Sequence, residues 1–180
     1  GLFSHPQKEI FVQSGLFEGL ADVYKLKDTQ RAILWKDSRF AGISSEGTLV
    51  VWKRPFDIKV EIVSIEGGKF EHEKLETIIK GNSAETFLDI LMVEEGQLGL
   101  FFFNGKLESR LEPGRYAFWK NAGKIKLYQK DMREKVVEVP AQDIMTADKV
   151  TLRMTAVLAY KIDDVLKAVM TADDVVTSVY

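Results

Sequence analysis

The side chains best suited to chemistry in this sequence are two histidines, His5 and His72, the only histidines among its 180 residues. Acidic residues lie near both: Glu9, Glu71, Glu73 and Glu76. Imidazole and carboxylate groups together form a ligand set that zinc accepts. However, no second histidine lies within one helical turn, and the pattern is not His-Glu-x-x-His. We expect no metal site, and we interpret both histidines as framework residues that cap a helix or pack between units.

Pairs of adjacent acidic residues are the remaining candidates for acid–base chemistry: Glu94-Glu95, Asp163-Asp164 and Asp173-Asp174. General acid–base catalysis needs carboxylates that converge in a concave pocket. These pairs lie instead at expected turns or helix starts, where carboxylates are solvated or act as caps. The chain has no cysteine, no Ser/His/Asp arrangement and no P-loop, because Ile65–Lys69 lacks the required spacing. We therefore expect no catalytic residue, no cofactor and no enzyme activity.

The overall charge and hydropathy exclude further classes of function. The formal net charge of -2 offers no basic field for nucleic acid. No apolar stretch approaches the roughly 20 residues of a membrane-spanning helix, and Leu98–Phe103 is better read as a buried strand than as a membrane insertion. Trp52 and Trp119 can anchor at a membrane interface, but core packing at a sheet rim is the preferred interpretation.

The elements that position these residues occur twice, because residues 3–60 and 70–127 form two similar repeats displaced by 67 positions. Eleven identities fall in register: Phe3/Phe70, His5/His72, Glu9/Glu76, Glu18/Glu85, Asp22/Asp89, Gln30/Gln97, Gly47/Gly114, Trp52/Trp119, Lys53/Lys120, Ile58/Ile125 and Lys59/Lys126. Internal repeats build surfaces and arrays more often than catalytic pockets. We call these segments the first and the second repeat.

Each repeat is predicted to be a β-meander that begins with short helical stretches. Ser4 and Ser83 are expected helix caps, and Leu16–Ala21 and Ala84–Leu88 are expected second helices. Strands follow at Gln30–Lys36, Thr48–Lys53 and Ile58–Val60, and at Gln97–Phe103, Arg115–Lys120 and Ile125–Leu127. Asn104-Gly105 between apolar runs predicts a tight type I′ hairpin. The chain begins inside a repeat and ends without a terminating signal, so we expect a soluble fragment of a longer protein.

The last third of the chain departs from the repeat. Val136–Val139 is expected to be a strand, which Pro140 either ends or places at a sheet edge. Alternation over Val150–Ile162 predicts a half-buried antiparallel strand. Asp163-Asp164 should then begin a helix with Val165, Leu166, Val169 and Met170 facing inward, and Thr171–Asp173 resembles the cap of another helix.

Several stretches resemble the stomatin/prohibitin/flotillin (SPFH, or band 7) family. Leu111–Lys120 resembles the turn and strand near the start of that domain, and Asp131–Glu134 is similar to the family's Asp-Leu-Arg-Glu stretch. Val137–Arg153 and Ala156–Val169 resemble the segments that follow. The resemblance covers the chain from about residue 90 to residue 180, and the nearest branch resembles bacterial slipins with extra copies of the N-terminal β-unit.

The resemblance implies an α+β domain with an antiparallel sheet and packed helices. Residues 1–69 would be a duplicated β-unit, and residues 70–180 a band 7 domain truncated at its C-terminal end. It also implies a non-enzymatic scaffold that forms homo-oligomers, organises microdomains on the cytoplasmic face of the cell membrane, and pairs with a membrane protease of the NfeD type. Lipid contact would come from parts outside this chain. The alternative is a soluble adaptor whose repeats bind a protein partner by edge-strand or surface contacts.

Overall fold

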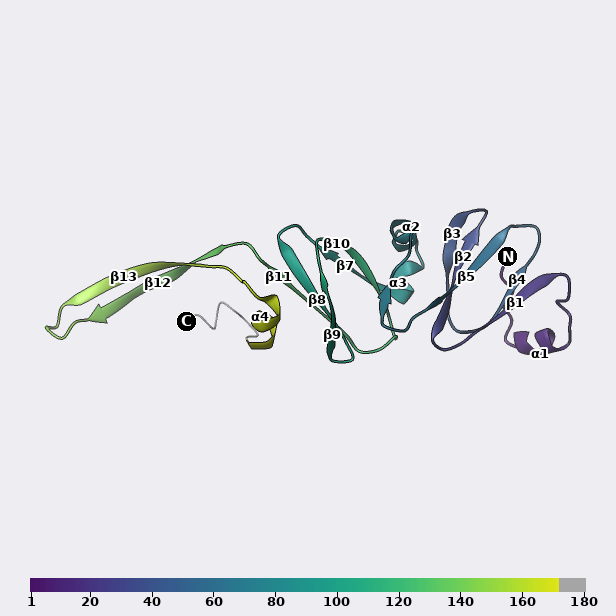
Figure 1. Cartoon of the computed structure of the whole chain (residues 1–180), viewed down its shortest axis with the longest axis horizontal. Helices are drawn as coiled ribbons and strands as arrows, with labels where there is room; N and C mark the ends of the chain where they lie inside the picture. Colours follow the sequence, from purple (N-terminus) through teal and green to yellow (C-terminus); the bar gives the residue numbers. More distant parts are fainter. Residues whose placement is uncertain (172–180) are drawn as a thin grey trace. The chain divides into compact units, whose positions relative to one another are not determined.

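The computed structural model describes residues 1–171 (Figure 1). Antiparallel strands dominate and the helices are short, which confirms the predicted α+β fold class. The chain divides into two compact bodies. The first comprises residues 1–92, 103–105 and 115–125, and the second comprises residues 93–102, 106–114 and the described residues from 126 onward.

The first repeat contains one helix and five strands: α1 (Lys8–Gln13), β1 (Ala21–Leu26), β2 (Gln30–Lys36), β3 (Arg39–Ser44), β4 (Gly47–Trp52) and β5 (Ile58–Ser64). Strands β1 and β4 form a two-stranded sheet, and β2 is the centre of a three-stranded sheet in the order β3-β2-β5. Both faces of β2 are buried. This explains its continuous apolar run, because a strand covered on both sides has no reason to alternate.

The second repeat has the same order of strands. Its elements are β6 (Lys69–Phe70), α2 (Leu75–Ile79), α3 (Ala84–Phe87), β7 (Leu88–Val93), β8 (Gln97–Phe103), β9 (Lys106–Leu111), β10 (Gly114–Trp119) and β11 (Ile125–Asp131). Each of β7 to β11 begins and ends 67 residues after its counterpart among β1 to β5. The sheets again pair as β10-β7, with β6 added at the edge, and as β11-β8-β9.

Equivalent polar contacts occur in the two repeats, 67 residues apart. Lys53 pairs with Asp22 at 3.3 Å, and Lys120 pairs with Asp89 at 3.4 Å. The tight turns also correspond: Asn104 and Gly105 have φ of 50° and 86°, as the predicted type I′ hairpin requires. The predicted hairpin therefore forms.

Two hydrophobic clusters lie on opposite faces of the β3-β2-β5 sheet. One fills the space between this sheet and the β1-β4 pair: Leu26, Ala32, Leu34, Leu49 and Val51. The other joins the opposite face of the sheet to the start of the second repeat: Ile33, Trp35, Ile43, Ile65, Phe70, Ile78, Ile79, Ala84, Leu88, Ala117 and Trp119. All of these residues lie in the first compact body.

Ser83 stands at the N-cap position of α3, as predicted, whereas Gln7 and not Ser4 stands at that position before α1. Ser4 and Ser83 make no capping hydrogen bond, and the Oγ of Ser83 is buried without a partner. His5 makes a different local contact, because the backbone N–H of Gln7, the N-cap residue of α1, donates to Nδ1 of His5 at 3.1 Å in the turn before the helix. The predicted helix at Leu16–Ala21 is also wrong, since this stretch forms turns with Gly15 and Gly19 at φ of 75°.

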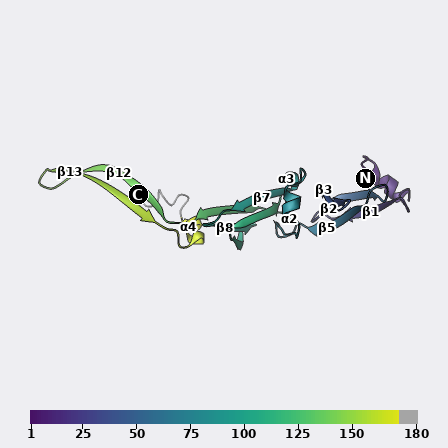
Figure 2. The ribbon, with the colours of Figure 1, turned by 90° about the horizontal axis from the view of Figure 1, so that it is seen from above.

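The chain continues as a long hairpin, β12 (Lys135–Met145) and β13 (Thr151–Tyr160), whose strands run side by side in Figures 1 and 2. Pro140 does not end β12. It lies where the register shifts between Val139 and Gln142, so the strand accommodates it as a bulge in a two-stranded sheet with open edges.

The helix α4 (Val165–Thr171) begins where the paired aspartates predict it. The Oδ1 of Asp164 accepts hydrogen bonds from the N–H groups of Leu166 at 2.9 Å and Lys167 at 3.2 Å. Val165 is buried, but Met170 is 72% exposed, which corrects its predicted inward position. The helix cap expected at Thr171–Asp173 extends outside the described residues. No helix within residues 1–171 is long and apolar enough to cross a bilayer.

Candidate functional site

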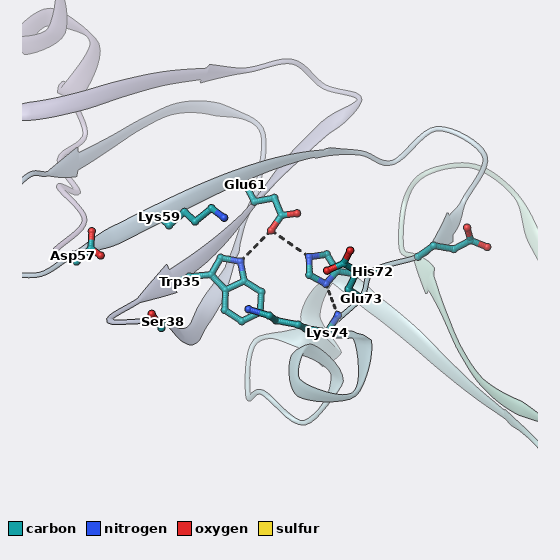
Figure 3. A pocket seen from close by; sticks show the side chains of 9 residues that line it. Trp35, Ser38, Asp57, Lys59, Glu61, His72, Glu73 and Lys74 are labelled. Carbon is teal, nitrogen blue, oxygen red and sulfur yellow. Dashed lines mark hydrogen bonds and ion pairs between the residues drawn. The ribbon is translucent and has the colours of Figure 1, made fainter.

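One polar cluster lies at the junction where the sheet of the first repeat meets the start of the second (Figure 3). Glu61 on β5 accepts two hydrogen bonds on one carboxylate oxygen, from the indole Nε1–H of Trp35 and from Nε2 of His72, each at 3.2 Å. The rings of Trp35 and His72 stack with centroids 5.9 Å apart. The ammonium group of Lys74 lies 4.7 Å from the centroid of the indole ring.

The second nitrogen of His72 fixes its tautomer. Its Nδ1 accepts a hydrogen bond from the backbone N–H of Lys74 at 2.9 Å, so in the neutral ring the proton is on Nε2, facing Glu61. The hydrogen bond from His72 is the main cause that lowers the pKa of Glu61 below its ordinary value, and desolvation opposes it. His72 therefore stabilises the turn that precedes α2 and also joins the two repeats.

This cluster has little capacity for catalysis. The hollow beside it is open and contains charges of both signs, with Lys59, Asp57 and Glu73 among its lining residues. Both ring nitrogens of His72 are engaged, so neither is available to activate a nucleophile. Within residues 1–171, no three His, Asp or Glu side chains converge as a metal site would require. The arrangement is that of a structural joint.

The structure places the other residues singled out in the sequence in different surroundings. Trp119 is buried in the core, whereas Trp52 is half-buried in a smaller cluster. Leu100 and Phe101 are buried, whereas Leu98, Phe102 and Phe103 are half-buried, so the strand predicted at Leu98–Phe103 is buried only at its centre. Glu94 and Glu95 are exposed just before β8, at the turn that the sequence predicted. Asp173-Asp174 lies outside the described residues.

The β12–β13 hairpin carries a surface that sequence reasoning did not predict. Directly opposed pairs place Val137 with Leu158, Val139 with Ala156, Gln142 with Met154 and Ile144 with Leu152 on one face. We call these eight residues the hairpin face. Leu152 and Met154 are 53% and 55% exposed, so the prediction of a half-buried strand is wrong for the described chain. The alternation was visible in the sequence, but nothing in the sequence showed that this face would lack a cover.

A charged clamp precedes the hairpin, in the stretch that resembles Asp-Leu-Arg-Glu. The Nε and Nη2 of Arg133 each donate to a different carboxylate oxygen of Asp131 at 3.0 Å, and the backbone N–H of Arg133 adds a third bond at 3.1 Å. These contacts lower the pKa of Asp131 to about 2. Two parallel bonds fix the guanidinium orientation, so the clamp fixes the turn that leads into β12.

Comparisons with known proteins agree with this part of the chain. Residues 91–180 match the family model described as SPFH domain / Band 7 family. An uncharacterized protein of Methanocaldococcus jannaschii is 31% identical over 88 residues, which are 47% of this chain and 42% of that protein. A putative band 7 family protein of Acanthamoeba polyphaga mimivirus is 26% identical over 87 residues, which are 48% of this chain and 28% of that protein.

The chain therefore spans less than half the length of these curated relatives. No solved structure matches it. The matched half includes β8 to β11, the Asp131–Arg133 clamp and the hairpin, and the family model covers half of all residues. The chain belongs to the SPFH domain / band 7 family.

Proposed function

We propose that this protein is a non-enzymatic, membrane-associated scaffold that associates with copies of itself and organises membrane proteins around the assembly. Membership of the SPFH family supports membrane association in general. The observation that carries the self-association is the hairpin face. It presents paired apolar side chains on two strands of 11 and 10 residues, and most of it is exposed within the described chain.

An exposed apolar sheet face of this kind is energetically unfavourable unless something covers it. Burying one leucine fully is worth about 1.5–3 kcal/mol, so two or three such side chains supply a useful part of an interface. A second copy of the hairpin offers a face of the same chemistry. Both outer edges of the hairpin also lack a strand partner within residues 1–171, which permits sheets to extend between copies.

The proposal also divides the chain into two parts. In this division, residues 1–69 form an added β-unit and residues 70–180 carry the band 7 domain. The support is the recurrence of β1 to β5 as β7 to β11, together with a family match that begins at residue 91. Within this scheme the assembly acts on the cytoplasmic face of the membrane, and a membrane protease of the NfeD type is the proposed partner.

The test of self-association compares two substitutions on the same strand. Leu152→Asp places a charge on the hairpin face, whereas Thr155→Asp places the same charge on the opposite face of β13. Sedimentation velocity over a concentration series should show association of the unchanged chain. We expect Leu152→Asp to weaken this association at least about tenfold, because 1.4 kcal/mol corresponds to a factor of ten. Equal behaviour of the two variants, or a monomer at every concentration, would remove the hairpin face from the proposal.

A second candidate function is a soluble adaptor that binds a protein by adding a strand to a free edge. The open edges of the hairpin favour it. Flotation with liposomes separates the two functions when it is done on the full-length protein. Co-flotation that survives removal of protein partners supports the scaffold. A protein that stays at the bottom of the gradient in a complex of fixed stoichiometry supports the adaptor.

A further inference from the structure

The start of the second repeat offers a template for interpreting the start of the first. In the second repeat, seven apolar residues pack against the outer face of the β3-β2-β5 sheet, where Ile33, Trp35 and Ile43 lie. Their seven counterparts, each 67 positions earlier, form one cluster in the first repeat: Phe3, Phe11, Val12, Phe17, Ala21, Val50 and Trp52. We call these residues the N-terminal packing face.

Only one of the two equivalent faces is covered by a sheet. In the second repeat all seven residues are buried, whereas in the first repeat Phe17, Ala21 and Val50 are buried and the other four are only half-buried. Ser83 lies against the sheet, with its Oγ 3.3 Å from the ideal Cβ position of Gly42. Its counterpart Leu16 is 58% exposed.

Leu20 shows the same contrast. It is 58% exposed, whereas its counterpart Phe87 packs against the main core. A repeat whose outer face needed no partner would carry polar residues at these positions. The apolar residues at Leu16 and Leu20 therefore indicate a surface that a partner covers.

His5 provides an independent observation. Its Nδ1 accepts the backbone N–H of Gln7 at 3.1 Å, and its ring stacks on Phe3 with centroids 6.2 Å apart. The corresponding values for His72 are 2.9 Å to Lys74 and 6.0 Å to Phe70. The neutral ring of His5 is thus fixed in the same tautomer, with the proton on Nε2.

The two histidines differ in whether their Nε2–H group has a hydrogen-bond acceptor. His72 contacts Glu61, a residue of the covering sheet, whereas no residue of 1–171 accepts a hydrogen bond from Nε2 of His5. By equivalence with the contact between His72 and Glu61, a carboxylate is the group that a covering sheet would place opposite Nε2 of His5.

We propose that the N-terminal packing face is a docking site for the face of a three-stranded antiparallel β-sheet that carries a carboxylate opposite His5. The partner sheet resembles β3-β2-β5 in architecture but is smaller at one point. A Cβ at Gly81 would overlap the ring of Phe40 on β3, and the counterpart of Gly81 is Ser14. The partner sheet must therefore carry a side chain smaller than phenylalanine there.

The test joins a stand-in for this sheet to the intact chain. The probe is a second copy of residues 1–67, carrying Phe40→Ala, added before Gly1 so that the spacing of 67 is kept. The readout is amide hydrogen exchange of residues 8–20 in the original chain. We expect docking to slow this exchange on the order of 100-fold, because amides under a packed sheet exchange only through opening. The matched control adds Ile33→Asp in the joined copy and should restore fast exchange.

Two further arms test the carboxylate. We expect Glu61→Gln in the joined copy and His5→Gln in the original chain each to reduce the protection several-fold, and the double variant to lose no more than either alone. Unchanged exchange of residues 8–20 in the joined protein would overturn the proposal. So would protection of the same amides in the unmodified chain by phosphatidylcholine–phosphatidylglycerol vesicles, because the surface would then be a lipid contact. These results do not depend on the hairpin face, so the proposed scaffold function can fail or hold separately.

Discussion

Truncating two equivalent phenylalanines should reveal how unequally the two repeats are covered. Phe70 is 3% exposed and lies in the main core, where its ring meets that of Trp119 with centroids 4.9 Å apart. Phe3 occupies the same position in the first repeat but is only half-buried. Replacing a fully buried phenylalanine by alanine costs about 3–5 kcal/mol, since a cavity remains. At Phe3 water and neighbouring side chains can fill the space, so we expect about 1–2 kcal/mol.

Urea unfolding followed by tryptophan fluorescence measures this difference. The three tryptophans of the sequence, Trp35, Trp52 and Trp119, all lie in the first compact body, as do both phenylalanines, so the signal reports that body alone. We expect Phe70→Ala to lower the midpoint two to three times as much as Phe3→Ala, with an unchanged slope. Equal losses would refute the reasoning, because the first repeat would then be as well covered as the second.

Three further outcomes follow from the described contacts. The contact with His72 lowers the pKa of Glu61, so the ionised carboxylate contributes stability above its ordinary pKa of 4.5, and this contribution is lost as the pH falls through the lowered folded value. Glu61→Gln should therefore destabilise the protein at pH 7, and urea titrations should show this loss shrinking progressively as the pH falls below 4.5. The carboxyl of Asp131 should titrate by NMR at about 2, and Arg133→Gln should return it toward 3.8. Gly81→Ala should cost about 1–3 kcal/mol in thermal unfolding, because a new methyl group meets an aromatic ring of β3.

The sequence predicted those elements whose structure depends on residues that are neighbours in the chain. The Asn104-Gly105 turn formed because only residues that tolerate positive φ suit a type I′ hairpin. Asp164 began α4 because a carboxylate can accept the free N–H groups of the first turn. The failures share a different cause. Ser83 stands at the N-cap position of α3, yet its Oγ is buried against the sheet of the first repeat and makes no capping bond.

The remaining features depend on contacts between residues that are far apart in the sequence. The alternation over β13 fixes which side chains share a face, but it cannot say what lies opposite them, and here Leu152 and Met154 stay exposed. The joint at Glu61 was equally hidden, because its partners Trp35 and His72 are 26 and 11 residues away in the sequence. The repeat alignment gave one usable signal, since His5 and His72 stood in register.

The two uncovered surfaces lie in different compact bodies, which matters for how an assembly could grow. The hairpin face belongs to the second body, and the N-terminal packing face belongs to the first. A chain with one self-complementary surface stops at a dimer, whereas a chain with a second, chemically distinct surface can hold two neighbours at once. The carboxylate requirement at His5 makes the second surface selective, because an apolar face alone would also accept the hairpin face. Under the two proposals, one chain can join a second copy through the hairpin face while its N-terminal packing face holds a sheet that carries a carboxylate.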